Sequence, residues 1–157
     1  MKLIVMRHGR AESPIQGRPD HERALTPRGV EWLQSQGIAM LRAGLKPDVL
    51  ACSPYRRARE TADLLAAAFG IAPLVVEGLR PGADIEVYAA LLEGIDTPAT
   101  LMTVHHQPDV SAVVYALTGA SVPMDEGHAA VIDVRRLAGM GGQLRGLYEA
   151  EVMARLG

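Results

Sequence analysis

Three residues after the first apolar segment have the composition of an anion-binding turn. Arg7, His8 and Gly9 directly follow the apolar run at 2–6, which has the length and composition of a buried β-strand. A guanidinium and an imidazole at a strand end can both bind an anion, and a glycine allows a sharp turn with close approach of the backbone. Because such a tripeptide is common by chance, its position after a strand is what makes it informative.

A second cationic side chain, Arg57, lies near the start of an expected helix. Ser53 and Pro54 follow a predicted strand at 48–52 and indicate the N-cap and the first position of that helix. The partial positive charge of the helix N-terminus and Arg57, one turn later, could serve the same anion site. The neighbouring Arg56 shows that arginines are common here, so the local sequence alone favours a solvent-exposed Arg57.

Two adjacent histidines, His105 and His106, end a predicted strand at 100–104. Neighbouring residues of an extended chain face opposite sides, so one should face the site while the other is structural. The further ligands that a metal site could use are His8, His21 and Asp109. No pair of histidines has the spacing typical of zinc ligands, and we therefore expect neither a metal nor another cofactor.

The single cysteine, Cys52, also precedes the expected loop. Cysteine-dependent phosphatases have an arginine after five intervening residues, but that position is Ala58 here. We therefore expect Cys52 to be a small buried hydrophobic residue. One cysteine allows no disulfide framework, which favours a reducing compartment.

Short apolar segments alternate with amphipathic ones along the whole chain. This alternation predicts an α/β three-layer sandwich, in which helices cover both faces of a mostly parallel sheet with an antiparallel C-terminal edge. The expected strands are 2–6, 48–52, 73–76, 100–104, 129–134 and 143–148. The expected helices run from Thr26-Pro27 to Gly44, from Ser53-Pro54 to Gly70, from Asp84 to about Gly94, and over about 108–118.

Ligands of such sheets bind beyond the carboxyl ends of the parallel strands. The residues predicted at those ends are Arg7 to Gly9, Ser53, Glu77 and the histidine pair. With 157 residues and no evident linker, we expect one domain spanning residues 1–157.

Composition restricts the partners. The net charge of -2 gives no reason to expect nucleic acid or an anionic membrane as a partner. The first apolar run is far shorter than the core of a signal peptide, and no apolar stretch approaches the roughly 20 residues of a membrane span. We therefore expect a cytoplasmic protein.

Four segments together resemble the histidine phosphatase superfamily, whose fold is that of phosphoglycerate mutase. They occur in the family's order and span residues 3 to about 118. They are Arg7-His8-Gly9, Arg23-Ala24-Leu25-Thr26-Pro27-Arg28-Gly29, Ser53-Pro54-Tyr55-Arg56-Arg57-Ala58-Arg59-Glu60-Thr61-Ala62 and Val104-His105-His106-Gln107-Pro108. The chain is most similar to the short bacterial protein-phosphohistidine phosphatases, with which it shares a Leu-x-Pro-x-x-Asp stretch from Leu79 to Asp84.

The resemblance implies a covalent mechanism. His8 would attack phosphorus and form a transient phosphohistidine, and Arg7, Arg57 and His106 would hold the phosphoryl oxygens without a metal. It therefore selects His106, rather than His105, for the site. His8 must be unprotonated at the attacking nitrogen, whereas a protonated His106 would suit the bound anion.

One position departs from the family. Many members have a glutamate that protonates the leaving group, and in the short phosphohistidine phosphatases it would fall at Gly78. Glu77 lies one residue earlier, where an extended chain faces the other side, so Glu77 is only a possible general acid.

Three functions remain open at this point. The first is a phosphohistidine phosphatase whose partner is a phosphorylated protein with a phosphorelay-type domain. The second is a phosphatase of small phosphomonoesters, and the third is a non-catalytic module that binds a phosphorylated ligand. The short chain leaves little room for an insertion that would roof the site, which favours the first, and the presence of all four site residues disfavours the third.

Overall fold

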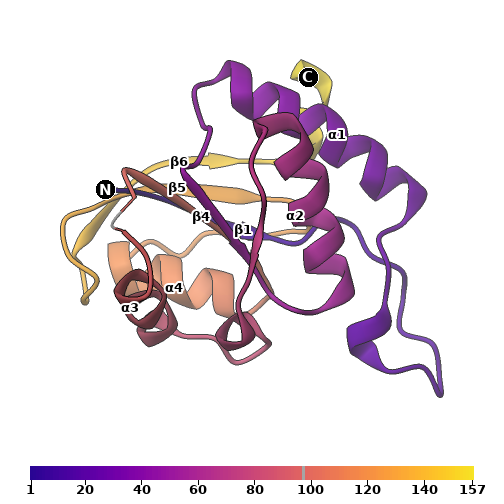
Figure 1. The fold of residues 1–157 in the computed structure, drawn as a ribbon, viewed down its shortest axis with the longest axis horizontal. Helices are drawn as coiled ribbons and strands as arrows, with labels where there is room; N and C mark the ends of the chain where they lie inside the picture. Colours follow the sequence, from indigo (N-terminus) through magenta and orange to yellow (C-terminus); the bar gives the residue numbers. More distant parts are fainter. Residues whose placement is uncertain (97) are drawn as a thin grey trace.

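A six-stranded sheet forms the centre of the protein in a computed structural model that describes residues 1–96 and 98–157. The strand order is β3-β2-β4-β1-β5-β6. Figure 1 labels β1, β4, β5 and β6 at the centre of the molecule. The strands are β1 (Lys2–Arg7), β2 (Val49–Cys52), β3 (Leu74–Val75), β4 (Thr100–His105), β5 (Ala129–Val134) and β6 (Gly142–Tyr148). The first four run parallel, and β5 and β6 add an antiparallel edge, as predicted.

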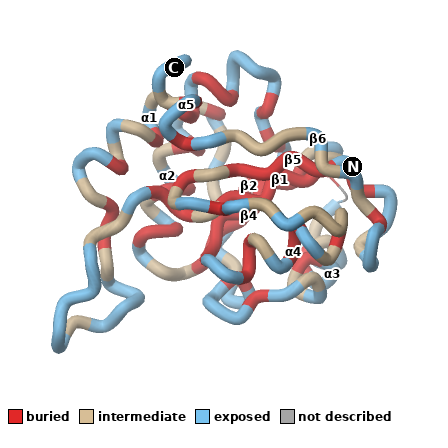
Figure 2. The backbone as a smooth tube through the Cα atoms, turned by 180° about the vertical axis from the view of Figure 1, so that it is seen from behind, coloured by how far each residue is buried: buried red, intermediate tan, exposed pale blue. Residues whose placement is uncertain are grey.

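β1 occupies an inner position because it is apolar on both faces. Leu3 and Val5 pack toward one layer of helices and Ile4 and Met6 toward the other, and all four are fully buried. Figure 2 shows this buried centre, with the exposed segments around it. β1 lies between β4, to which it is parallel, and β5, to which it is antiparallel, so its carboxyl end is enclosed on both sides.

Helices cover both faces, which confirms the predicted three-layer α/β fold. One face carries α1 (Pro27–Arg42), α2 (Arg56–Phe69) and α5 (Ala150–Leu156). The other carries α3 (Ile85–Glu93) and α4 (Asp109–Thr118). Short 3₁₀ turns, η1 (Asp20–Glu22) and η2 (Glu77–Leu79), lie in the connections.

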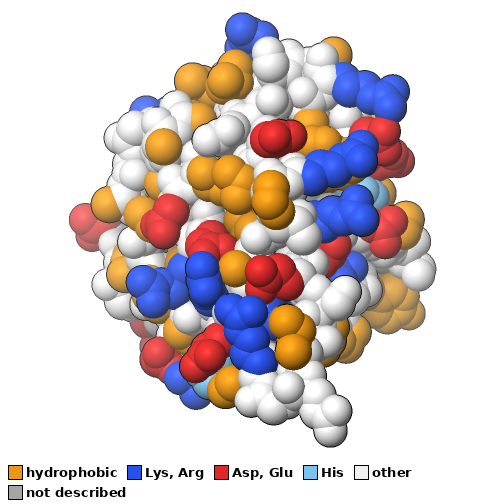
Figure 3. Space-filling view, turned by 90° about the vertical axis from the view of Figure 1, so that its right-hand side faces the viewer, with side chains coloured by type: hydrophobic (Ala, Val, Ile, Leu, Met, Phe, Trp, Pro, Cys, Tyr) orange, Lys and Arg blue, Asp and Glu red, His pale blue; other side chains and the backbone are white. Residues whose placement is uncertain are grey.

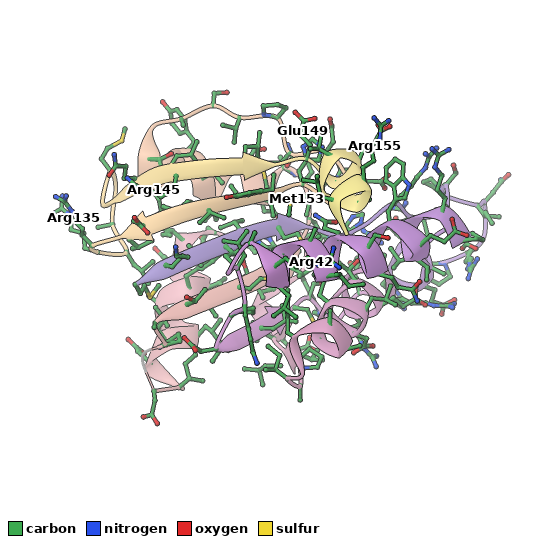
Figure 4. The ribbon with its side chains drawn as sticks, turned by 90° about the horizontal axis from the view of Figure 1, so that it is seen from above. Arg42, Arg135, Arg145, Glu149, Met153 and Arg155 are labelled. Carbon is green, nitrogen blue, oxygen red and sulfur yellow. The ribbon has the colours of Figure 1, made fainter. Side chains whose placement is uncertain are left out.

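The C-terminal helix α5 was not expected from the sequence. Its seven residues lack a side-chain N-cap, so local signals for it are weak. Met153 is buried in the core, and Arg42 of α1 donates a hydrogen bond to the carbonyl of Gly157 at 3.0 Å. Figure 4 shows α5 lying beside α1, with Met153 and Arg42 labelled. Packing against α1 therefore stabilises this helix.

Helix starts agree with the sequence at two places and differ at a third. Thr26 caps α1 by accepting a hydrogen bond from the amide of Gly29, and Asp84 caps α3 in the same way. The predicted cap at Ser53 is wrong, because α2 begins at Arg56 with Tyr55 as its N-cap. The Ser53 hydroxyl accepts a hydrogen bond from the Tyr55 amide and also reaches the candidate site.

No helix in the part of the chain that the structure describes is both long and apolar enough to cross a membrane.

Gly29 allows the loop after His8 to lie directly against α1. A Cβ atom at Gly29 would be 2.4 Å from the carbonyl oxygen of Arg10, and that oxygen also accepts a hydrogen bond from the Thr26 amide. The absence of a side chain thus fixes the distance between the loop and the helix.

We predict that Gly29→Ala lowers the free energy of unfolding by about 1–3 kcal/mol, the usual cost of overpacking. A Cβ atom at Gly139 would meet no other atom within 4 Å, and Gly139 does not have a positive φ, so Gly139→Ala is the matched control. Urea denaturation of both variants measures the difference. Equal stability of the two variants would contradict the close approach described here.

Candidate active site

The carboxyl ends of the inner strands meet around the main chain of His8. The His8 amide donates to the His105 carbonyl at 3.0 Å, and the His8 carbonyl accepts from the Gly127 amide at 2.9 Å. Segments far apart in sequence therefore fix this residue from both sides. Figure 3 views the side of the molecule toward which β1 runs in Figure 1, and shows basic and acidic side chains interspersed there.

The His8 ring has a defined tautomer. Its Nδ1 atom lies 2.8 Å from the Gly9 carbonyl oxygen, which can only accept, so Nδ1 carries the proton. In the neutral ring Nε2 then has a free lone pair, and it accepts a hydrogen bond from Nε of Arg57 at 3.1 Å. The Gly9 amide in turn donates to the Thr61 hydroxyl of α2. This geometry leaves Nε2 as the nitrogen that could attack phosphorus.

Arg57 is buried in the site, contrary to the solvent-exposed position that the local sequence favours. Its Nη2 atom lies 3.4 Å from Nδ1 of His106, while Nε faces His8. Arg56 is exposed and pairs with Glu60 on the outer side of α2. The helix rotation thus separates two adjacent arginines into an inner and an outer one.

The two adjacent histidines lie on opposite sides of β4. His106 accepts from Arg57 at Nδ1, so its Nε2 carries the proton and donates to the Ser53 hydroxyl at 2.7 Å. His105 contacts the Tyr88 hydroxyl at 2.8 Å in the core beneath the α3–α4 layer. The structure therefore brings His106, and not His105, to the side chains of Arg57 and His8.

Arg7 extends the site on the β5 side. Its Nη1 atom donates to the carbonyl of Met124 at 3.1 Å. Its Nε atom is buried and has no hydrogen-bond partner among the described residues. A buried donor without a partner is costly, so this Nε is a candidate donor to a bound anion.

Asp20, which no motif in the sequence indicated, also contacts Arg57 in this site. Arg57 donates from Nη1 to the Asp20 carbonyl at 2.8 Å and from Nη2 to the carboxylate at 3.0 Å. Arg23 donates to the same carboxylate at 2.8 Å. Asp20 thus binds the Nη1 and Nη2 atoms of the guanidinium. The Nε atom contacts His8, and Nη2 also reaches His106. Asp20 begins the short 3₁₀ turn η1 in a connection without sequence periodicity, so no pattern indicated it, although its spacing of three from Arg23 was visible.

Glu77 and Cys52 are not brought to these side chains. Glu77 is exposed on η2 and forms an ion pair with Arg80 at 2.7 Å. Cys52 is fully buried, as expected, and burial raises the pKa of its thiol to about 11. At neutral pH the Cys52 thiol is therefore protonated and unsuited to act as a nucleophile.

Burial keeps both site histidines neutral. It lowers the pKa of His8 to about 3, opposed by the hydrogen bond to Gly9 and reinforced by the charges of Arg57 and Arg7. Burial also lowers the pKa of His106 to about 3, with further contributions from His8 and Arg57. Thus the ligand-free protein contains a neutral His106, whereas the protonated form was expected for the complex with an anion.

The pKa of Asp20 moves the other way. Partial burial raises it, but hydrogen bonds and charge from Arg23 and Arg57 outweigh burial and lower it. Asp20 is therefore ionised at neutral pH and can balance the charge of Arg57.

No group of three His, Cys, Asp or Glu side chains in residues 1–96 and 98–157 could hold a metal ion.

Comparison with known sequences identifies the family. The sequence profile of the histidine phosphatase superfamily (branch 1) matches residues 3–110, which is more than half of the chain. The chain belongs to the histidine phosphatase superfamily. An uncharacterized protein of Picosynechococcus is 34% identical over 126 residues, which cover 76% of each chain.

Solved structures show that the superfamily fold extends over nearly the whole chain. The protein histidine phosphatase SixA, solved with tungstate, matches with a TM-score of 0.83 and 21% identity, over 98% of this chain and 99% of that one. The alpha-ribazole phosphatase of Shigella flexneri matches with a TM-score of 0.69 and 21% identity, over 96% and 97% of the two chains. These two proteins share the fold, and their names refer to different substrates.

The neutral His8 makes stability depend on pH. An unfolded histidine has a pKa near 6.5, so between about pH 6.5 and 3 the unfolded chain binds a proton that folded His8 does not. We predict that stability falls as the pH is lowered through this range, by up to about 1.4 kcal/mol per pH unit for this residue. Denaturation of wild type and His8→Gln between about pH 4.5 and 7.5 tests this, since removal of the ring should make the dependence shallower. Parallel curves would contradict a neutral buried His8.

The inner and outer arginines should respond differently to the same substitution. We predict that Arg57→Lys reduces phosphatase kcat/KM by about 100-fold or more, because a lysine cannot contact His8, His106 and Asp20 together. Arg56→Lys is the matched control and should stay within about twofold, since it changes only an exposed ion pair with Glu60 and keeps the positive charge. Similar losses of kcat/KM for both variants would show that the buried position of Arg57 does not determine its contribution to activity.

Proposed function

We propose that this chain is a metal-independent phosphatase that removes the phosphoryl group from a histidine of another protein. The observation that carries the proposal is the arrangement at His8, whose Nε2 lone pair accepts a hydrogen bond from Arg57 Nε, while the neighbouring Arg7 has a buried Nε without a partner among the described residues. An incoming phosphoryl group takes over the hydrogen bond from Arg57 and satisfies Arg7. Binding of the substrate therefore frees the Nε2 lone pair of His8, which then attacks phosphorus.

The reaction proceeds in two displacements. His8 Nε2 forms a bond to phosphorus while the bond from phosphorus to the substrate imidazole breaks. The substrate ring is protonated at its other nitrogen, so it leaves as neutral imidazole. Water then attacks phosphorus, the bond to Nε2 breaks, and inorganic phosphate leaves. The first step exchanges one P–N bond for another, so its products and reactants are similar in energy. Arg7, Arg57 and His106 hold the oxygens, and the added negative charge favours protonation of His106.

The available carboxylates favour an imidazole as leaving group. An alkoxide is strongly basic and normally needs a general acid, which contributes about 10²–10⁴-fold to the rate. Asp20 contacts Arg57, but its lowered pKa keeps it ionised, and Glu77 pairs with Arg80 on an exposed turn. Imidazole is less basic and leaves without such help. The fold similarity to SixA, described as a protein histidine phosphatase, supports the same substrate class.

The test compares a phosphohistidine-bearing phosphotransfer domain with small phosphomonoesters as substrates of the whole chain. We predict a kcat/KM at least about 100-fold higher for the phosphohistidine protein, because phosphomonoesters need a general acid for their leaving group and neither Asp20 nor Glu77 is placed to act as one. Rapid quenching should trap the phosphoryl group on His8, His8→Ala should abolish turnover without unfolding the protein, and a chelator should leave activity intact.

Other outcomes would favour the alternatives. Efficient turnover of phosphomonoesters alone would favour the small-molecule phosphatase, and binding without turnover would favour the non-catalytic module. Label found on Ser53 instead of His8, or loss of activity in a chelator with recovery on addition of a divalent ion, would overturn the proposed mechanism.

A further inference from the structure

Four aromatic rings lead outward from His8. The distance between ring centroids is 5.3 Å from His8 to His106, 5.0 Å from His106 to Tyr55 and 5.9 Å from Tyr55 to His21. His8 and His106 are buried, Tyr55 is half-buried, and the His21 side chain is 59% exposed. Tyr55 and His21 therefore border the solvent side of the site.

The guanidinium of Arg57 contacts one outer ring and binds the residue before the other. The Arg57 carbon atom Cζ lies 5.1 Å from the centroid of the Tyr55 ring. Asp20, which precedes His21, accepts two hydrogen bonds from Arg57. Tyr55 is fixed further by the hydrogen bond from its amide to the Ser53 hydroxyl. Tyr55 and His21 come from different parts of the chain, yet both are positioned relative to the phosphoryl-binding side chains.

In-line displacement places the leaving group opposite His8, toward solvent, where these rings lie. We infer that Tyr55 and His21 form an aromatic rim that holds a planar aromatic leaving group and thereby determines substrate specificity. Aromatic rings attract one another in edge-to-face or offset contacts worth about 0.5–1.5 kcal/mol beyond burial. A non-aromatic leaving group gains none of this. The inference rests on the proposed function, because the aromatic leaving group of that reaction is the imidazole of phosphohistidine.

The test uses two pairs of substrates that differ in whether the leaving group is aromatic. N-phosphoimidazole and phosphoramidate both contain a P–N bond, and p-nitrophenyl phosphate and acetyl phosphate both have a weakly basic oxygen leaving group. For each pair the measured quantity is the ratio of kcat/KM for the aromatic over the non-aromatic substrate. The second pair keeps this test separate from the proposed function, because it needs no phosphohistidine activity.

We predict that Tyr55→Leu lowers both ratios by about 3- to 10-fold, the range that one aromatic contact provides. Tyr55→Phe should keep the wild-type ratios because it retains the ring, and His21→Ala should lower them by about twofold. Tyr115, which is exposed on α4, provides the matched control Tyr115→Leu, with wild-type ratios expected.

Three results would contradict the inferred role of the aromatic rim. Equal losses on both members of each pair in Tyr55→Leu would mean that Tyr55 acts only through Arg57 and His106. Loss of the ratio in Tyr55→Phe would assign the effect to the hydroxyl group. If Tyr55→Leu fails to fold, wild-type ratios in His21→Ala decide against the rim.

Discussion

The hydrogen bond between Arg57 and His8 is the contact on which the site depends. A guanidinium that is 4% exposed is unfavourable unless its donors are used, and burial lowers the pKa of Arg57 accordingly. Asp20 supplies the opposite charge, and the two histidines accept from the side that faces the strand ends. One side chain thereby contacts both imidazoles and a loop more than thirty residues away in sequence, and its charge adds to the effect of burial in lowering the pKa of His8 and His106.

Much of this arrangement could be predicted from the sequence. Alternating apolar and amphipathic segments indicated the sheet, its two layers of helices and the antiparallel edge, because burial on both faces dictates continuous apolar strands such as β1. Strand ends indicated where Arg7, His8 and the pair His105-His106 would lie, and the family resemblance selected His106. The family resemblance was needed to choose Arg57 over Arg56, because the rotation of α2 depends on packing that a single sequence does not reveal.

Other features could not be predicted, for a common physical reason. Ser53 precedes a proline and resembles a helix cap, but its hydroxyl is used by His106, which is distant in sequence. Asp20 lies in an irregular segment and gains its role only when Arg57 approaches. The helix α5 is too short to be stable alone and depends on α1. Each of these depends on a tertiary contact, whereas the confirmed features follow from local pattern.

The central place of β1 has a consequence for how the molecule is made. Lys2 pairs with Thr100 on one side and with Asp133 on the other. During synthesis β1 therefore leaves the ribosome before either neighbour exists, and its apolar residues 3–6 stay unpaired until β4 and then β5 emerge. Such late, non-local pairing slows folding and exposes a strand that other chains can bind. Because the Gly127 amide that holds His8 precedes β5, a nascent chain lacks this contact of the site until the segment before β5 has been made.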